Sequence, residues 1–304
     1  MIGIYLSGTG NTKYCVTKLV KLIDASADVV PLEDEFIIDK IKRNETVILG
    51  YPTQFSNAPY MVRDFIQMHA SLWKGRKMIC VATMGAFSGD GSGCAARLLK
   101  KYGAEILSGV HIKMPDSVCD SKLLKRQMEE NKKIIEKADR KIYEAAKRIK
   151  QGDYLKEGLT IFSHIAGLFG QRLWFYKKTA GYTDQLKINE DCTGCGMCEE
   201  ICPMKNIIME KGKPHPGDQC TMCYRCILHF CKIYIVFKFI LFYNFTSQKS
   251  DCLFRTITDT AVTHGTLIPW VGFSFFHDYI FHGTNFLTHT TPRGSVYHVL
   301  PLYL

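Results

Sequence analysis

The spacing of the cysteines constrains this chain of 304 residues more than any other feature. Nine of the thirteen cysteines lie between Cys192 and Cys252, and eight of these nine follow one another at short intervals. Many cysteines in a small secreted domain would predict disulfides, whereas short spacings in an intracellular chain predict metal ligands. We therefore expect a metal-binding segment in the carboxyl-terminal half and a reducing compartment around the protein.

These cysteines form an internal repeat. The first copy reads C-x2-C-x2-C-x3-C-P and consists of Cys192, Cys195, Cys198, Cys202 and Pro203. The first three cysteines recur 28 residues later, while the fourth recurs 29 residues later and without a following proline. The members of the second copy are Cys220, Cys223, Cys226 and Cys231.

The first copy is similar to the cluster motif of bacterial ferredoxins, in which three thiolates hold one iron-sulfur cluster and the fourth reaches another. The resemblance implies two [4Fe-4S] clusters. One would be held by Cys202, Cys220, Cys223 and Cys226, and the other by Cys192, Cys195, Cys198 and Cys231. The second copy departs from the family at Cys231 and at Lys232, which replaces proline, so the role of Cys231 stays open. Zinc is the alternative, but it leaves the third cysteine and Pro203 unexplained.

The first 150 residues alternate short apolar strands with helical patterns, which predicts an α/β fold with a parallel sheet covered on both faces. The expected strands are residues 2–6, 28–32, 46–50, 77–83 and 105–112. The expected helices are residues 12–24, 57–69, 93–102 and 121–150. Five strands with these crossovers suffice for a doubly wound sheet.

A loop rich in glycine and hydroxyls follows the first strand and precedes the first helix. It consists of Ser7, Gly8, Thr9, Gly10, Asn11 and Thr12. At such a place backbone N–H groups and the helix dipole hold an anion, and glycines let the backbone approach it. The Walker motif would need lysine at position 9, and the dinucleotide motif would need a small residue at Lys13. A terminal phosphate monoester suits the loop best.

This loop resembles the phosphate loop of flavodoxins, which binds flavin mononucleotide (FMN). The resemblance implies strand order 2-1-3-4-5 and a ligand at the carboxyl ends of the strands, enclosed by the loops after the third and fourth strands. Besides residues 7–12, the candidate FMN-binding residues are Pro52, Thr53, Phe55 and Asn57 in the first flavin loop and Thr83, Met84, Gly85, Phe87 and Gly91 in the second. Either Phe55 or Phe87 could stack on the ring, and ordinary loop packing is the alternative for each.

The expected domains are a flavodoxin-like domain over 1–150, a helical connector over 151–183, a small α+β ferredoxin module over 184–231, and an anomalous tail over 232–304. The connector carries apolar residues spaced for a helix that packs through its apolar side. They are Ile161, Ile165, Leu168, Phe169, Leu173 and Phe175.

The tail differs in composition from the rest of the chain. Residues 227–304 hold eight of the 68 charged residues and no glutamate, but eleven of the eighteen phenylalanines. We interpret this as a shifted reading frame or a misplaced gene end, with an unusual aromatic domain as the alternative. The isolated cysteines Cys15, Cys80, Cys94, Cys119 and Cys252 are expected to be buried or incidental thiols.

The net charge of +10 is partly concentrated in residues 120–150, which hold eleven basic and six acidic residues. This predicts a solvated helix face, with a docking surface for an acidic redox partner as the alternative. Nucleic-acid binding is not expected, because the basic excess lacks interleaved aromatic residues and a known motif. The longest apolar run, 233–245, is broken by Lys238, so no membrane span is expected, and we expect a cytoplasmic protein.

The two resemblances together match flavodoxin/ferredoxin fusion electron carriers of anaerobic bacteria and archaea. They imply a relay of electrons between FMN and [4Fe-4S] clusters, with redox proteins as partners. No acid–base pair or nucleophile assembles from the sequence, which favours a carrier over a substrate-transforming enzyme. The alternatives are a flavin-dependent reductase of a small substrate and an FMN-binding redox protein whose cluster module is incomplete.

Overall fold

The computed structural model describes residues 1–116, 126–173, 186–188, 192–229, 233–239 and 243–247. Its amino-terminal half contains one five-stranded parallel sheet in the order β2-β1-β3-β4-β5, as expected. The strands are β1 (Ile2–Tyr5), β2 (Asp28–Pro31), β3 (Thr46–Pro52), β4 (Lys77–Met84) and β5 (Glu105–Lys113). This strand order is that of the flavodoxin-like fold, and it leaves the carboxyl ends of β1 and β3 side by side at the switch point.

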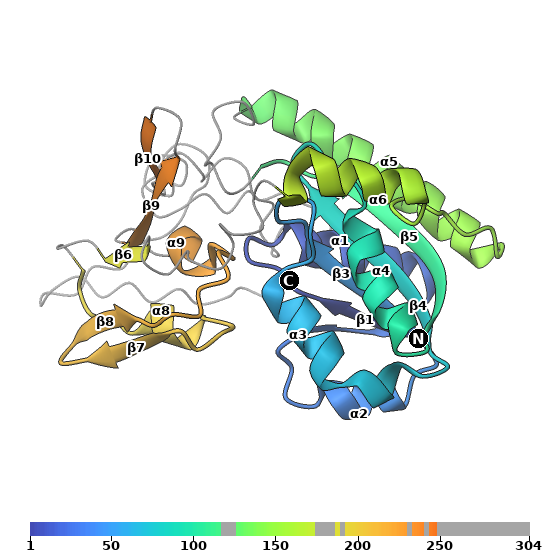
Figure 1. Ribbon diagram of the computed structural model, residues 1–304, viewed down its shortest axis with the longest axis horizontal. Helices are drawn as coiled ribbons and strands as arrows, with labels where there is room; N and C mark the ends of the chain where they lie inside the picture. Colours follow the sequence, from blue (N-terminus) through green and yellow to red (C-terminus); the bar gives the residue numbers. More distant parts are fainter. Residues whose placement is uncertain (117–125, 174–185, 189–191, 230–232, 240–242, 248–304) are drawn as a thin grey trace, which may run out of the picture. The chain divides into compact units, whose positions relative to one another are not determined.

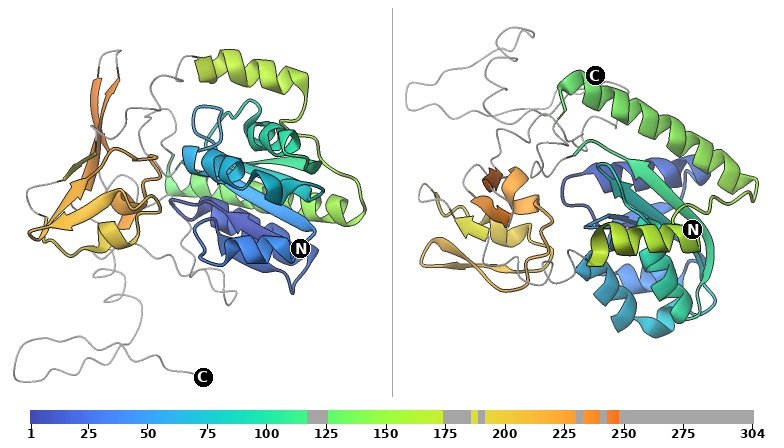
Figure 2. Two further views of the ribbon diagram at one scale, coloured as in Figure 1. Left: turned by 60° about the horizontal axis from the view of Figure 1, so that its bottom comes forward. Right: turned by 45° about the horizontal axis from the view of Figure 1, so that its top comes forward.

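Helices cover both faces of this sheet (Figures 1 and 2). The helices are α1 (Asn11–Ile23), α2 (Ile37–Lys42), α3 (Tyr60–Met68), the short η1 (Ala70–Trp73), α4 (Gly91–Lys101) and α5 (Met128–Lys150). One apolar core joins one face of the sheet to α2, α3, η1 and α4. The other joins the opposite face to α1 and α5. The central strands β1, β3 and β4 are therefore buried on both sides, which explains why their sequences are nearly continuous apolar runs.

Two elements differ from the sequence prediction. The six-residue helix α2 was not predicted, because only Ile37 and Ile41 bury and so short an element carries little periodic signal. Helix α5 is described from Met128, where a capping box formed by Gln127 and Glu130 starts it, and the expected helical residues 121–125 lie outside the described part of the chain.

Helix α5 otherwise follows the prediction. Its buried side includes Ala138, Ile142, Ala145 and Ile149, while most of its lysines and arginines are exposed. This agrees with a solvated basic face. Cys15 and Cys80 are both fully buried, Cys15 in the core beneath α1 and α5 and Cys80 in the core on the opposite face of the sheet, as expected for structural thiols. Cys119 and Cys252 lie outside the described residues.

The connector forms α6 (Ile161–Gly167) and a π-helical turn η3 (Leu168–Arg172). The helical prediction is correct here, but the expected burial of its apolar side is wrong. Ile161 is 77% exposed, Phe169 63% and Leu173 55%, whereas Arg172 is mostly buried. The physical reason is that the polar side of this helix meets a buried carboxylate, as shown below. Phe175 lies outside the described residues.

The carboxyl-terminal module contains β6 (Leu186–Ile188), α8 (Met197–Glu200), the hairpin β7 (Ile207–Glu210) and β8 (Lys213–Pro216), α9 (Arg225–His229), β9 (Ile233–Phe239) and β10 (Tyr243–Ser247). Its small core consists of Leu186, Cys198, Ile207, Tyr224 and Ile227. Strand β6 pairs antiparallel with β9, so regular pairing continues past residue 231, where the module was expected to end. In the described part of the chain, no helix is long and apolar enough to cross a membrane.

Candidate flavin and cluster sites

The phosphate loop lies between the end of β1 and the start of α1. Helix α1 begins after Gly10, which adopts a left-handed conformation (φ 93°) and provides no side-chain cap. The Gly10 N–H donates to Ser7 Oγ (3.1 Å), which leaves the Ser7 hydroxyl proton to donate elsewhere. A helix amino terminus with a left-handed glycine and a donating hydroxyl beside it is suited to an anion.

Two further residues of this loop are buried at the carboxyl edge of the sheet. Thr12 Oγ1 lies 2.7 Å from Thr83 Oγ1 at the end of β4, and whichever hydroxyl accepts this bond keeps its own proton for a ligand. Asn11 Nδ2 donates to Pro115 O (2.9 Å), while Asn11 Oδ1 is buried without a partner among the described atoms. An orphaned carbonyl oxygen suits a ligand hydroxyl, and FMN offers hydroxyls next to its phosphate. The donor set therefore fits FMN.

The first flavin loop turns sharply after β3. Gln54 and Asn57 exchange backbone hydrogen bonds of 3.0 and 2.9 Å, with Phe55 (φ 49°) and Ser56 (φ 57°) both left-handed between them. Left-handed phenylalanine is costly, and such outliers concentrate at ligand sites. Thr53 ties this loop to β4, because its N–H donates to Thr83 O (2.8 Å).

The second flavin loop connects β4 to α4 and contains several buried polar groups. Asp90 is fully buried, and Ser88 is 2% exposed. Tyr51 at the end of β3 donates its hydroxyl to Gly91 O (2.6 Å), which fixes the start of α4. Phe87 is half exposed, whereas Phe55 is partly buried, and the structure gives no reason to rank them as stacking partners.

A partly buried histidine, His111, supports this second loop from β5. His111 Nε2 accepts from the Ser92 N–H (3.2 Å), and His111 Nδ1 lies 3.2 Å from Ser88 Oγ. Because Nε2 accepts, the hydrogen-bond pattern assigns the ring proton to Nδ1. Burial lowers the pKa of His111, and the neighbouring Glu157 opposes this shift. The neutral ring therefore holds the loop in place.

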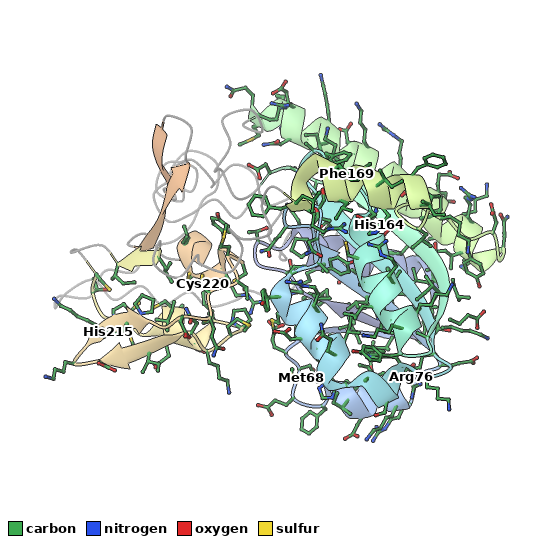
Figure 3. All side chains as sticks on the ribbon, viewed as in Figure 1. Met68, Arg76, His164, Phe169, His215 and Cys220 are labelled. Carbon is green, nitrogen blue, oxygen red and sulfur yellow. The ribbon has the colours of Figure 1, made fainter. Side chains whose placement is uncertain are left out.

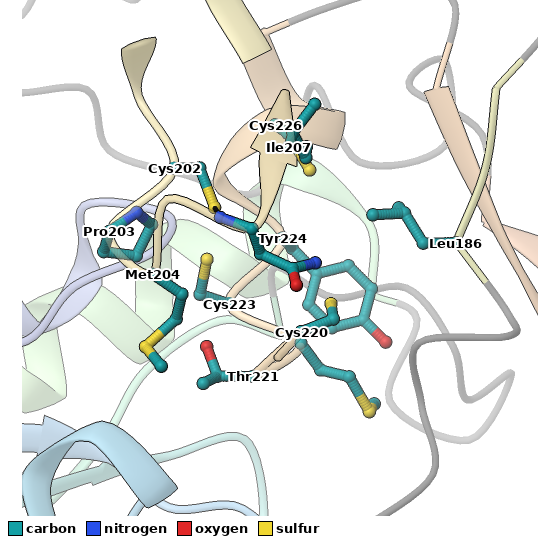
Figure 4. A pocket seen from close by; sticks show the side chains of 12 residues that line it. Leu186, Cys202, Pro203, Met204, Ile207, Cys220, Thr221, Cys223, Tyr224 and Cys226 are labelled. Atoms are coloured by element: carbon teal, nitrogen blue, oxygen red, sulfur yellow. Dashed lines mark hydrogen bonds between the residues drawn. The ribbon is translucent and has the colours of Figure 1, made fainter. Parts of the chain in front are cut away.

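The four cysteines that the ferredoxin resemblance assigns to one of the two clusters line a single pocket (Figure 4). They are Cys202, Cys220, Cys223 and Cys226. The walls are largely apolar and include Leu186 and Ile207. The Asn206 N–H donates to Cys202 Sγ (3.3 Å), the kind of backbone bond that tunes a cluster sulfur.

The environment of this pocket disfavours free thiolates. Burial raises the pKa of Cys223 to about 11, and repulsion from Cys220 and Cys202 adds to the shift. Burial also raises the pKa of Cys226, and Cys223 adds to it. Thiolates in such a pocket need a cationic centre to stabilise them, because metal binding displaces the thiol protons.

The first motif forms a tight turn before α8. Gly194 (φ 69°) and Gly196 (φ 77°) are both left-handed, and Cys198 is buried. Burial raises the pKa of Cys198, with smaller contributions from Cys192 and Cys195, so the three sulfurs influence one another. Cys231, the expected fourth ligand, lies outside the described residues.

Among the described side chains, no group of three or more His, Cys, Asp or Glu residues converges as tightly as a single metal ion requires. A cubane cluster presents its irons at separate corners, so its thiolates stand farther apart than the ligands of one ion.

Comparisons with known proteins bear on both halves of the chain. A family described as a 4Fe-4S binding domain matches residues 186–208, which include the whole first cysteine motif. No curated protein sequence matches the chain. The amino-terminal sheet and the matched domain together are consistent with a flavodoxin/ferredoxin fusion.

Several solved structures are similar to about half of the chain. A flavodoxin from the domain Archaea is 18% identical, with a TM-score of 0.36, and covers 49% of this chain and 97% of its own. The flavodoxin of Megasphaera elsdenii is 24% identical, with a TM-score of 0.36, and covers 48% and 98%. The Trp repressor binding protein of Bacillus subtilis is 17% identical, with a TM-score of 0.37, and covers 49% and 96%.

Sequence reasoning missed the polar groups that brace the flavin loops. Asp90 gave no signal beyond its place in a glycine-rich loop, and His111 is one of several polar residues in β5 and follows no motif. Arg172 lies in a segment whose apolar pattern drew attention to the wrong side of the helix. Only tertiary contacts bring these residues together.

Proposed function

We propose that the protein is an electron carrier in which FMN in the amino-terminal domain exchanges electrons with [4Fe-4S] clusters in the carboxyl-terminal module. When bound, FMN accepts one or two electrons and each cluster accepts one, so the pair couples two-electron donors to one-electron carriers. The observation that carries this proposal is the apolar pocket lined by four cysteines in the same chain as a phosphate loop at a sheet switch point.

The residues proposed to hold FMN are those of the phosphate loop and the two flavin loops. The buried hydroxyls of Ser7 and Thr12 and the orphaned Asn11 Oδ1 support this assignment. The backbone of the two flavin loops, tied together through Thr53 and Thr83, would flank the ring. Phe55 or Phe87 would face it.

The residues proposed to hold the clusters are the eight motif cysteines. Cys202, Cys220, Cys223 and Cys226 are supported by their shared pocket, and Cys192, Cys195 and Cys198 by their common turn. Cys231 is proposed as the remaining ligand on the ferredoxin resemblance. Redox proteins are the proposed partners, and a reducing, anaerobic cytoplasm keeps cysteine thiols available as cluster ligands.

The test is the content of iron, acid-labile sulfide and FMN in anaerobically purified full-length protein. About eight irons per FMN support two clusters and the complete relay. About four support one cluster and favour a carrier with an incomplete module. FMN without iron contradicts the relay and reduces the protein to a flavin-binding protein, and iron without FMN contradicts the flavin assignment.

A further inference from the structure

The connector presents its polar side to the second flavin loop. His164 Nδ1 in α6 lies 2.9 Å from Asp90 Oδ2, and Arg172 at the end of η3 forms an ion pair with Asp90 Oδ1. Figure 3 shows His164 and Phe169 on this helical segment. Asp90 is fully buried, so its charge requires such partners.

Arg172 also reaches the first flavin loop. Its Nη2 donates to Ser56 O at 2.8 Å and its Nε donates to the same oxygen at 3.2 Å. Ser56 is the second left-handed residue of the Phe55–Ser56 turn and is only 1% exposed. One guanidinium thus satisfies a buried carbonyl in the first loop and a buried carboxylate in the second.

The backbone of the connector also approaches the second loop closely. A Cβ at Gly89 would lie 2.3 Å from Gly167 Cα, so neither chain leaves room for a side chain at this crossing. A Cβ at Gly170 would lie 3.3 Å from Phe87 Cε1, which places the candidate stacking ring against η3. The connector therefore packs against the second loop by shape as well as by charge.

Other cations near Asp90 do not join the two loops. Arg97 of α4 pairs with Asp90 Oδ2, as does His164, and the contacts described for these two side chains do not include the first loop. The Cys94 thiol also lies near both groups, 3.5 Å from Ser56 O and 3.8 Å from Asp90 Oδ1, but a thiol is a weak donor with one proton. Among the described cations, Arg172 is therefore the one that connects Ser56 to Asp90. A planar guanidinium can do this because it donates in several fixed directions at once.

We propose that Arg172 is a positioning residue of the flavin site, which locks the two flavin loops together so that the connector sets the affinity for FMN. The inference rests on the proposed FMN binding. Its consequence is that residues 1–150 do not form the complete flavin site, because a guanidinium from beyond that domain holds the loops in their ligand-binding arrangement.

The test compares Arg172→Met and Arg172→Lys with the full-length wild-type protein. Arg148→Met is the matched control, because Arg148 forms an exposed ion pair with Asp153 away from the loops. The readouts are the Kd for FMN of the flavin-free protein, the visible spectrum of bound flavin and the Tm without flavin.

We expect Arg172→Met to weaken FMN binding about tenfold or more, which corresponds to about 1.4 kcal/mol, and to shift the flavin spectrum. Arg172→Lys should be intermediate, because an ammonium cannot serve both loops with the geometry of a guanidinium. Arg148→Met should bind FMN as the wild type does.

An unchanged Kd in Arg172→Met, even with a lowered Tm, overturns the inference and leaves Arg172 a structural residue. If Arg172→Met does not fold, Arg172→Lys decides, since wild-type affinity and spectrum in that variant overturn the positioning role. Failure of the wild-type protein to bind FMN is a separate result, which contradicts the proposed function itself.

Discussion

Single residues at the carboxyl edge of the sheet carry the proposed flavin chemistry through buried polar contacts. Thr12 of α1 and Thr83 of β4 share one hydrogen bond, and His111 accepts a backbone N–H from Ser92 only while its ring is neutral. Burying such groups is costly unless each keeps its partner. Substitutions and changes in pH that remove one partner should therefore have measurable effects.

The pH dependence of the free energy of unfolding should report the protonation of His111. Burial lowers the pKa of His111 in the folded state, whereas the same side chain has its ordinary pKa of about 6.5 in the unfolded chain. The stabilising contribution of neutral His111 is complete above that value and is lost as the pH falls below it. The slope that one such group adds has an upper limit of about 1.4 kcal/mol per pH unit. Urea unfolding of the flavin-free protein between pH 7 and pH 5 measures it.

The matched variant is His111→Gln, whose amide oxygen can still accept from Ser92 but does not titrate. We expect the free energy of unfolding of this variant to change less between pH 7 and pH 5, a range above that in which ordinary carboxylates titrate. An identical slope in both proteins would show that another group controls the acid sensitivity.

Removing the phosphate-loop hydroxyls should affect FMN and leave the clusters intact. We expect Thr9→Ala with Thr12→Ala to weaken FMN binding about tenfold or more, since a hydrogen bond to a charged group contributes about 1.5–3 kcal/mol. Flavin fluorescence titration and iron analysis measure the two effects. Thr17→Ala in the same helix is the control. Loss of iron with unchanged flavin affinity would count against the assignment.

At the scale of elements, most of the amino-terminal half could be predicted because its central strands are buried on both sides and its helices are amphipathic. All five strands agree with the prediction to within two residues at either end. The predicted phosphate loop and both flavin loops lie at the same edge of the sheet because parallel strands bring their carboxyl ends together. Helix α2 could not be predicted, because two buried isoleucines do not form a periodic pattern.

The connector shows what a sequence pattern leaves undetermined. Its period correctly indicated a helix, but the pattern could not show which side would meet the domain. A buried Asp90 attracts His164 and Arg172, and this leaves Ile161 and Phe169 exposed. Which side of the helix is buried thus depends on the charge of Asp90, 74 residues away from His164 in sequence, and the local sequence carries no information about it.

The turn of the first cysteine motif should tolerate no side chain at Gly194. A Cβ there would lie 2.2 Å from Gly212 O, in addition to the cost of roughly 1–2 kcal/mol for a left-handed alanine. We expect Gly194→Ala to lose about half of the iron. Gly196→Ala is the control, because Gly196 is also left-handed but has open space around it. Equal loss in both variants would show that backbone strain alone is responsible.

At the scale of the whole molecule, the chain carries two separate candidate sites, one in each half. The feature that the sequence predicts least well is the carboxyl-terminal boundary of the cluster module. Strand β9 pairs with β6 although it lies in the segment assigned to the anomalous tail. Composition indicated a break near residue 227, but pairing of β9 depends on backbone hydrogen bonds that composition does not record.

Cysteine variants should separate the two clusters. We expect Cys202→Ser and Cys231→Ser each to lose about half of the iron while FMN content stays unchanged. Iron and sulfide analysis with electron paramagnetic resonance of the reduced protein measures this. Cys15→Ala in the flavodoxin-like core is the control. Full iron content in Cys231→Ser would show that another group completes the cluster of Cys192, Cys195 and Cys198.

The central claim is that electrons pass between flavin and cluster within one molecule. Its most direct test reduces the protein anaerobically with a short pulse of reductant and follows flavin and cluster absorbance over a series of protein concentrations. The account predicts electron exchange with a first-order rate that does not depend on protein concentration. A rate proportional to concentration, or no exchange at all, would contradict it.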